Sequence, residues 1–281
     1  MLLTEKHIRQ FAGYYLICFL LNYVWYFYNG LTFSSLKPVF FVNRLDFTRN
    51  ILFLTDMQHI LMQHKWLFAC FDIVYFILPL LLGYTILKNK KGRQITAGCT
   101  AAFSLVYSIY FSSTSYISIE VFVVWMMLPL LFCYSTVKGF YYNMHILRII
   151  FIIIFFSSAL WKITSGGIFN KEQMAGVLLF QHAAYLTSNN NSLITKSIYY
   201  LVQHQLLAYC LYLAVFIGEF SFAVGFFTRK YDRFLIFILT TFLFFDYTIM
   251  FINYFAWMAF MGCFYFSRYS IDKQNSYFIP G

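Results

Sequence analysis

The chain has 281 residues, of which 61% are hydrophobic and only 11% are charged. Soluble domains carry roughly 25% charged residues, so this composition excludes a surface that faces water on every side. A net charge of +10 would suggest nucleic acid in a soluble protein, but here most basic residues lie in short loops between apolar runs. We therefore expect a polytopic membrane protein whose partner is the lipid bilayer, with no nucleic acid.

Four apolar runs in the first half of the chain are predicted to cross the membrane. Each approaches the ~20 residues that span hydrocarbon, and they cover residues 11–28, 66–87, 95–111 and 117–137. A long polar stretch, residues 29–65, follows the first run. Within it, residues 51–61 have apolar side chains at helical spacing but are too short to span, which predicts an interfacial or re-entrant helix.

The second half adds the spans 146–163 and 206–227. The polar stretch between them, residues 164–205, is predicted to contain an amphipathic surface helix over residues 171–186 and a loop over residues 187–192. The last run, residues 234–266, is too long for one span. We expect it to split near residues 248–253 into a seventh and an eighth span.

These elements predict an all-α fold, a single integral membrane domain over residues 1–281 with about eight transmembrane helices. Interfacial helices would lie in the long outer loops 29–65 and 164–205. Basic residues crowd the short turns on the side of the N-terminus, such as residues 88–93 and 229–233. The positive-inside rule therefore places both termini in the cytoplasm, and we expect the cytoplasmic membrane of a bacterium.

Lys162 is the first candidate for chemistry, because it lies inside the end of the fifth span, just before Gly166 and Gly167. A charged group within a membrane segment is costly and therefore suggests a functional site. A desolvated lysine can lose its proton and act as a base. The two glycines allow a sharp turn and close approach of the backbone. The structural alternative is an interfacial lysine that extends to the lipid headgroups beside Trp161.

Glu219 and Asp246 are the other candidate catalytic residues within apolar runs. An uncompensated carboxylate there should be protonated or paired. A hydrogen bond between helices would explain Glu219 structurally, and an early helix end at the outer interface would explain Asp246. Glu219 is expected to lie deeper than Lys162, so we do not expect a direct pair between them.

Histidines on the outer side do not form a recognisable metal motif. His59 and His64 are five residues apart, which misses one helix face, and no HExxH pattern occurs. We therefore assign no metal site. His182 and Arg44, both in the outer stretches, are kept as candidate substrate-binding residues.

Three stretches resemble the vitamin K-dependent gamma-carboxylase family, or more broadly the horizontally transferred transmembrane domain. Residues 158–162, followed by Gly167 and Met174, are similar to a family segment with a lysine near the outer end of a helix. Residues 219–222 resemble its Glu-Leu-Ser-Phe signature. Residues 245–258 resemble a third segment, in which Asp246 stands where the family usually has histidine.

The resemblance implies that Lys162 is a base that acts with a reduced quinone such as vitamin K hydroquinone. Trp161, Gly166, Gly167 and Trp257 are then candidate cofactor-binding residues. Because few residues follow the last predicted span, we expect no counterpart of the large lumenal domain of the carboxylases. Relatives with the membrane domain alone are associated with the maturation of secreted peptides, which implies an exported peptide as substrate.

The sequence leaves open whether the protein is an enzyme. The leading hypothesis is a membrane-embedded enzyme or maturation factor that acts on an exported peptide at the outer membrane face. Its reaction would be carboxylase-like or another quinol-dependent peptide modification. The alternative is a non-catalytic binding or assembly partner of a secreted or membrane protein. A quinone-linked oxidoreductase and a transporter are less favoured, because the cysteines are scattered and no inverted repeat is visible.

Overall fold

A computed structural model of the protein describes residues 2–36, 50–51, 54–56, 59–60, 63–64, 66–88, 92–114, 119–189 and 192–270. The elements in this part of the chain are helices, and the expected all-α class is confirmed. Leu2 and Ser270 form an isolated bridge. The chain divides into two compact units, unit 1 (residues 1–147 and 255–281) and unit 2 (residues 148–254). A single membrane domain stays a prediction.

Five helices in the described residues are long and apolar enough to cross a membrane: Trp66–Leu87, Arg93–Ser113, Val137–Thr164, Gln205–Phe227 and Asp232–Met250. They contain the second, third, fifth and sixth predicted spans except for small shifts of the ends. Two shorter apolar helices, Ile119–Phe132 and Phe255–Phe266, lie where the fourth and eighth spans were expected. The predicted interfacial helix at residues 51–61 lies largely outside the described residues.

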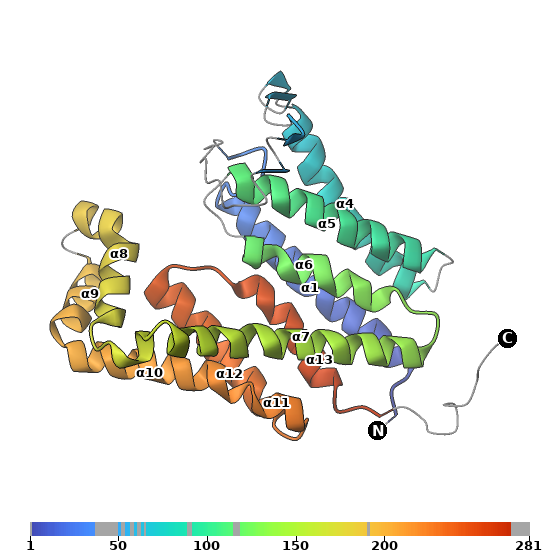
Figure 1. Ribbon diagram of the computed structural model, residues 1–281. Coiled ribbons are helices and arrows are strands. Elements are labelled where there is room, and N and C mark those ends of the chain that lie inside the picture. The colour runs from blue at the N-terminus through green and yellow to red at the C-terminus, as the bar shows by residue number, and fades with distance from the viewer. Residues whose placement is uncertain are drawn as a thin grey trace. The chain divides into compact units, whose positions relative to one another are not determined.

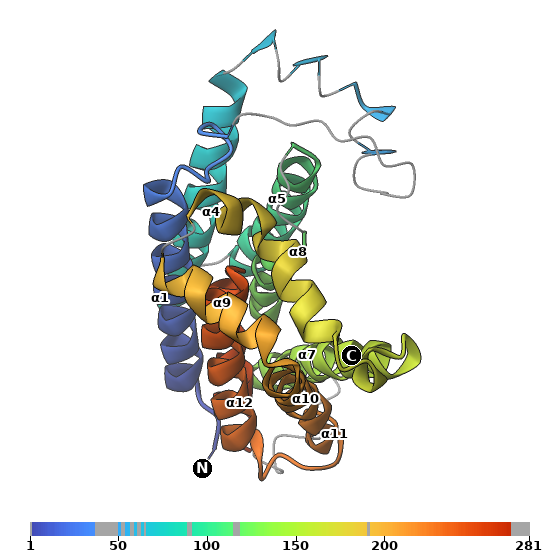
Figure 2. The same ribbon diagram turned by 90° about the vertical axis from the view of Figure 1, so that its left-hand side faces the viewer.

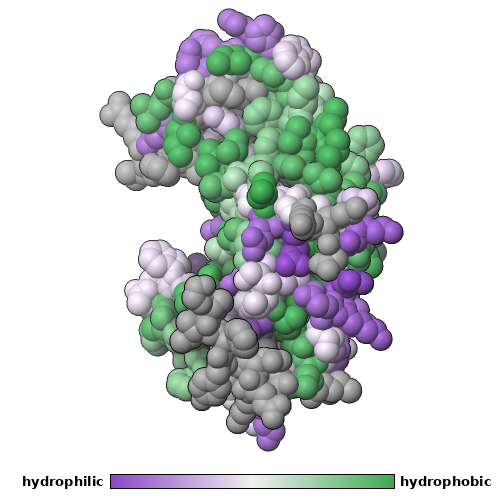
Figure 3. Space-filling model, turned by 90° about the vertical axis from the view of Figure 1, so that its right-hand side faces the viewer, coloured by the Kyte–Doolittle hydropathy of each residue, from purple (hydrophilic) through white to green (hydrophobic). Residues whose placement is uncertain are grey.

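Apolar side chains cover much of the surface shown in Figure 3. Exposed examples come from several of the long helices, among them Ile73, Ile153, Ile217 and Phe237. Water does not favour such a surface, whereas hydrocarbon does. The long helices are therefore suited to contact with lipid.

Unit 1 is built around α1 (Glu5–Tyr28), whose buried residues recur at helical spacing. The other helical elements of the unit are α4 (Trp66–Leu87), α5 (Arg93–Thr114), η1 (Ile119–Phe122), α6 (Val123–Met127), η2 (Leu128–Phe132), the start of α7 (Val137–Thr164), η5 (Phe255–Phe260) and α13 (Met261–Phe266). Its core is aromatic: Phe11 packs edge-on against Phe132 and Phe140, and Phe19 against Trp125. The first predicted span is therefore a helix with one buried aromatic face.

Unit 2 contains the rest of α7 and the helices that follow it, as Figures 1 and 2 show. They are η3 (Gly167–Phe169), α8 (Gln173–Ser188), α9 (Leu193–Gln203), α10 (Gln205–Ser221), α11 (Val224–Phe227), α12 (Asp232–Phe245) and the π-helix η4 (Asp246–Met250). In Figure 1, α8 and α9 stand across one end of α7 and α10. α8 lies where a helix over residues 171–186 was predicted, and its position at the membrane surface stays a prediction; α9 was not predicted.

A buried apolar cluster joins α8, α9 and α10 of unit 2. Met174 and Leu178 of α8 pack there with Ile198 of α9 and with Ala208 and Tyr212 of α10. Of the predicted loop at residues 187–192, residues 187 and 188 belong to the end of α8, and residues 190 and 191 lie outside the described residues. Ser192 caps α9 by accepting a hydrogen bond from the Thr195 amide. The stretch 164–205, which was predicted to be an outer loop, is therefore largely helical in the described residues.

The long C-terminal run breaks where the sequence predicts. α12 passes into η4, which ends at Phe251 with a positive φ of 55°, and helix resumes at Phe255. A left-handed backbone is uncommon for a bulky residue, and π-helical turns occur often at functional sites. The break divides the two units at residue 255.

Candidate functional site

Lys162 and Glu219 form a direct ion pair in unit 2. The Lys162 Nζ lies 2.6 Å from Glu219 Oε1 and 2.5 Å from Oε2. Ser158, one turn earlier on α7, donates to Glu219 Oε1 at 3.2 Å and accepts from Lys162 Nζ at 3.3 Å. The expectation that these residues would not pair was wrong, as was the alternative in which Lys162 extends only to headgroups.

The pairing follows from how far α10 extends. The turn after α7 contacts residues well inside α10: the Tyr209 hydroxyl donates to the Ile168 carbonyl at 2.6 Å, and Gly167 lies against the Tyr212 hydroxyl. α10 therefore starts beyond the end of α7, and Glu219 comes level with Lys162. Sequence position alone placed both helix ends at one depth, which is why the pair was missed.

The pair lies at the wall of a cavity of about 320 Å³. Its lining comes from four helical parts of unit 2, each of which contributes residues at helical spacing. They are the end of α7 with the residue after it (Ser158, Lys162 and Ser165), the start of α8 (Gln173, Met174 and Val177), α10 (Tyr212, Val215 and Glu219), and the end of α12 with the start of η4 (Phe242, Phe245 and Asp246). Trp161 and Met250 complete the lining. A volume of this size falls at the lower end of small-molecule sites.

Asp246 is the third charged residue at this cavity. It begins η4, and α8 supports that turn from the side. His182 Nε2 lies 2.7 Å from the Ile249 carbonyl oxygen, and the Gln181 side-chain amide donates to the Met250 carbonyl at 2.9 Å. Helix ends leave such carbonyls without intrahelical partners. His182 and Gln181 therefore fix the turn that presents Asp246.

The candidate residues around Lys162 have different environments. Trp161 lines the cavity but is largely exposed, as an interfacial tryptophan would be. Gly166 has a positive φ of 75°, which glycine adopts freely. A Cβ on Gly167 would lie 2.6 Å from the Tyr212 hydroxyl. The expected sharp turn and close backbone approach are thus present, and a cofactor-binding role for these residues stays a prediction.

Trp257 and His182 make contacts of their own. Trp257 belongs to unit 1, where its indole N–H donates to the Glu120 carbonyl at 3.0 Å. His182 is buried and packs edge-on against Phe251, so its side chain is used in supporting η4. Arg44 lies outside the described residues.

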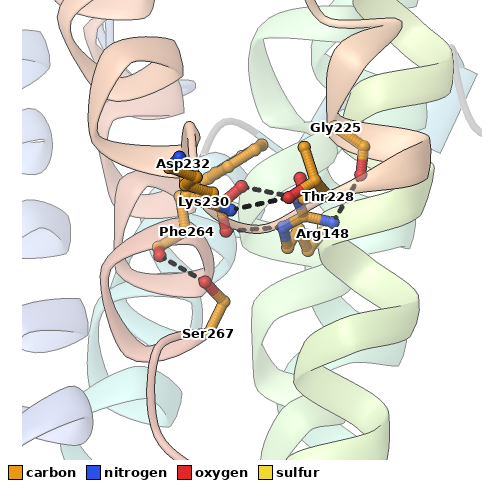
Figure 4. A network of polar contacts seen from close by, with 7 residues as sticks. All are labelled: Arg148, Gly225, Thr228, Lys230, Asp232, Phe264 and Ser267. Atoms are coloured by element: carbon orange, nitrogen blue, oxygen red, sulfur yellow. Dashed lines mark hydrogen bonds and ion pairs between the residues drawn. The ribbon is translucent and has the colours of Figure 1, made fainter.

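A second ion pair in unit 2 joins the start of α12 to α7, as Figure 4 shows. Arg148 donates to both oxygens of Asp232, at 2.8 and 2.5 Å. The same guanidinium donates to the carbonyls of Gly225 and Thr228, at 3.0 and 3.3 Å. Because Arg148 and Asp232 are both buried, this arrangement acts as a structural clamp.

Sequence reasoning missed several lining residues: Ser165, Gln173, Tyr212 and Phe245. A usable signal was the repeat of polar side chains at positions 158, 162 and 165, which share one helix face. Among the described residues, no group of three or more His, Cys, Asp or Glu side chains could hold a metal ion.

We compared the chain with models of protein families, with curated proteins and with solved structures, and none gives a significant match.

Proposed function

We propose that the protein is a membrane-embedded enzyme or maturation factor that acts on an exported peptide at the outer membrane face, with Lys162 as its base. The observation that supports this most is the Lys162–Glu219 pair at the wall of a cavity that also contains Asp246. Charged groups inside a membrane domain are expensive to keep, and clefts that concentrate them are frequent functional sites.

The pair offers a route for one proton. In the resting arrangement the ammonium of Lys162 contacts both carboxylate oxygens of Glu219. Transfer of that proton to Glu219 leaves a neutral amine, which can then accept a proton from a bound substrate. Ser158 contacts both members and orients them. Lys162 would therefore be the base and Glu219 the group that holds its proton.

The lining suits a flat amphipathic group. Trp161, Tyr212, Phe242 and Phe245 offer aromatic surface, and Lys162 offers a polar contact. A reduced quinone, the cofactor class that the resemblance implies, would supply an ionisable hydroxyl and a pair of electrons when bound. Lys162 and Glu219 would hold that hydroxyl and receive its proton.

A route from the outer side supports peptide access. A groove lined by Asn170, Glu172, Gln173, Gly176, Val177 and Phe180 shares Gln173 and Val177 with the cavity. The groove belongs to the helical layer that lies on the outer side in the proposed topology. Phe169 and Phe180, both exposed, are suited to the membrane interface beside it.

The proposal includes eight spans with both termini in the cytoplasm. Beyond the five long helices, α1, residues 119–132 and residues 255–266 would complete the set. Residues 119–132 are largely 3₁₀-helical, which rises about 2 Å per residue, so this stretch reaches roughly 25 Å despite its length.

The test compares exported peptides from host cells that carry the wild-type gene, the Lys162→Ala variant or no gene. Mass spectrometry should find a peptide whose mass changes with the wild-type protein and does not change with Lys162→Ala. Lys171→Ala, an exposed lysine in the same unit, should behave as wild type. Identical peptide masses with wild type and Lys162→Ala would contradict a catalytic role, provided that both proteins insert and fold.

The non-catalytic alternative predicts the opposite pattern. There, Lys162→Ala would be silent, and exposed residues of α9 such as Leu193 and Tyr200 would carry the effect. Their replacement by serine, with pull-down of an exported or membrane partner as the measurement, separates the two functions.

A further inference from the structure

The Asp246 carboxylate lies at the wall of the cavity. The residue is only 7% exposed, yet its carboxylate makes no hydrogen bond or ion pair with any residue in the described part of the chain. A buried carboxylate is unfavourable unless it is neutralised or paired. A cationic group that enters the cavity would supply the missing partner.

The position of this carboxylate is fixed by the protein. Asp246 starts η4, whose carbonyls at Ile249 and Met250 are held by His182 and Gln181 of α8. The Ile252 amide also donates to the Asp246 backbone carbonyl at 3.0 Å. The side chain is thus presented by a supported turn, as a preorganised binding group requires.

The charge of the cavity favours a cation. Lys162 and Glu219 neutralise each other through their close contacts. Asp246 is the remaining charged residue among those that line the cavity, so an ionised Asp246 gives the lining a net charge of −1. Electrostatic complementarity therefore selects a ligand group with one positive charge.

A second cavity adjoins the first on its apolar side. It has a volume of about 310 Å³ and is lined mainly by Phe155, Leu211, Ala214, Phe237 and Ile238. The two cavities share Val215, Glu219, Phe242 and Phe245, so they lie next to each other. The polar outer groove adjoins the charged cavity through Gln173 and Val177. Groove, charged cavity and apolar cavity therefore follow one another.

We propose that unit 2 binds the free N-terminus of a peptide, with Asp246 as the counterion of the ammonium group. The apolar first side chain of the peptide occupies the second cavity, and the rest of the peptide leaves along the outer groove. This proposal adds a binding mode to the proposed function. Only the statement that the bound peptide is a substrate rests on that function. The binding itself does not require Lys162 to be a base.

The probe is the tripeptide Leu-Gly-Gly amide, compared with its N-acetylated form. Its binding is measured as a saturable rise in the Tm of the full-length protein in detergent. The free peptide should raise the Tm, and acetylation or Asp246→Asn should weaken the apparent Kd about tenfold or more, because either change removes a charged hydrogen bond. Asp56→Asn, which changes an exposed carboxylate in unit 1, should bind as wild type.

Further variants separate this proposal from the catalytic one. Asp246→Glu keeps the negative charge and should retain binding, which guards against a variant that fails to fold. Lys162→Ala leaves Glu219 as a second negative charge at the cavity, so it should bind the free peptide at least as tightly as wild type, although it abolishes processing under the proposed function. Equal binding of the acetylated peptide, or undiminished binding by Asp246→Asn, would overturn the proposal. A Tm rise with short-chain phosphatidylethanolamine and none with the peptide would also overturn it, in favour of a lipid headgroup.

Discussion

Unit 2 contains two ion pairs that differ in what surrounds them. Arg148 and Asp232 are 3% and 5% exposed, and the guanidinium is also occupied by two backbone carbonyls. Lys162 is 18% exposed, and its partner Glu219 borders two cavities. On α7, Lys162 follows Arg148 by about 14 residues, or roughly 21 Å of helix. Asp246, at the start of η4, follows Asp232 of α12 by the same distance along the chain. The saturated pair thus lies at the start of α12 and in the middle of α7, and the open one lies near the C-terminal end of α7.

The contrast teaches how a membrane protein can separate stability from chemistry. A charge pair whose donors and acceptors are all used can only hold helices together. A pair beside a cavity retains groups that can meet a ligand or pass on a proton. We therefore expect substitutions at Arg148 and Asp232 to affect folding. Substitutions at Lys162, Glu219 and Asp246 should mainly affect function.

The largest effect is expected from Arg148→Met. This change leaves Asp232 buried without its partner and should cost about 3–5 kcal/mol of folding stability. A large fall in Tm, followed by circular dichroism in detergent, is the expected result. Arg229→Met, an exposed arginine nearby, should change the Tm little. The double variant Arg148→Met, Asp232→Leu should recover much of the loss, and no recovery would mean that the clamp is more than a charge pair.

Lys162→Met is expected to cost less stability, although it removes the proposed activity. Glu219 would keep the Ser158 hydroxyl as a donor and would face a cavity that has room for water. The loss should be about 1–3 kcal/mol. The Tm of the two methionine variants, measured side by side, tests the ranking. A Lys162→Met protein as unstable as Arg148→Met would make this pair a second clamp.

Gly167→Ala tests the cavity wall without changing charge. The added Cβ would lie 2.6 Å from the Tyr212 hydroxyl and must displace this lining residue, at a cost of about 1–2 kcal/mol. Gly176→Ala is the matched control, since a Cβ there meets nothing within 4 Å and alanine favours the helix α8. Thermal unfolding of both variants should move in opposite directions, and equal shifts would contradict the close contact.

Asp246→Asn is expected to have the smallest effect in the absence of ligand. It removes a buried charge that has no partner in the described part of the chain, so the Tm should stay near that of wild type or rise, within about 1 kcal/mol of stability. Asp232→Asn should instead lower the Tm, because it weakens the bond to Arg148. If both aspartates respond alike, their surroundings do not differ in the way described.

Much of the helical framework follows from sequence pattern. The run 66–87 is apolar throughout and becomes α4, and the break near residues 248–253 appears as η4 and the turn after it. The fourth and eighth runs are apolar too, yet they form shorter helices with 3₁₀ turns. Hydrophobicity predicts that such runs leave water, but it does not set the geometry of their turns.

The sequence indicated which single residues could be functional, but it did not indicate which of them lie together. Lys162, Glu219 and Asp246 were noticed because charge is rare in apolar runs. His182 was assigned to substrate, and the structure uses it to hold the Ile249 carbonyl. Its sequence context, an outer polar stretch, carries no information about which backbone group would need a partner.

The sequence by itself determined an all-helical, apolar chain with a few costly charges, because composition and period depend on residue order alone. Tertiary structure decided which charges meet. The offset between α7 and α10 brings Glu219 to Lys162, and the support from α8 leaves Asp246 facing a cavity. The position of one helix along another is set by packing between segments that are distant in the sequence. The residue pattern within a helix does not depend on where the neighbouring helix begins.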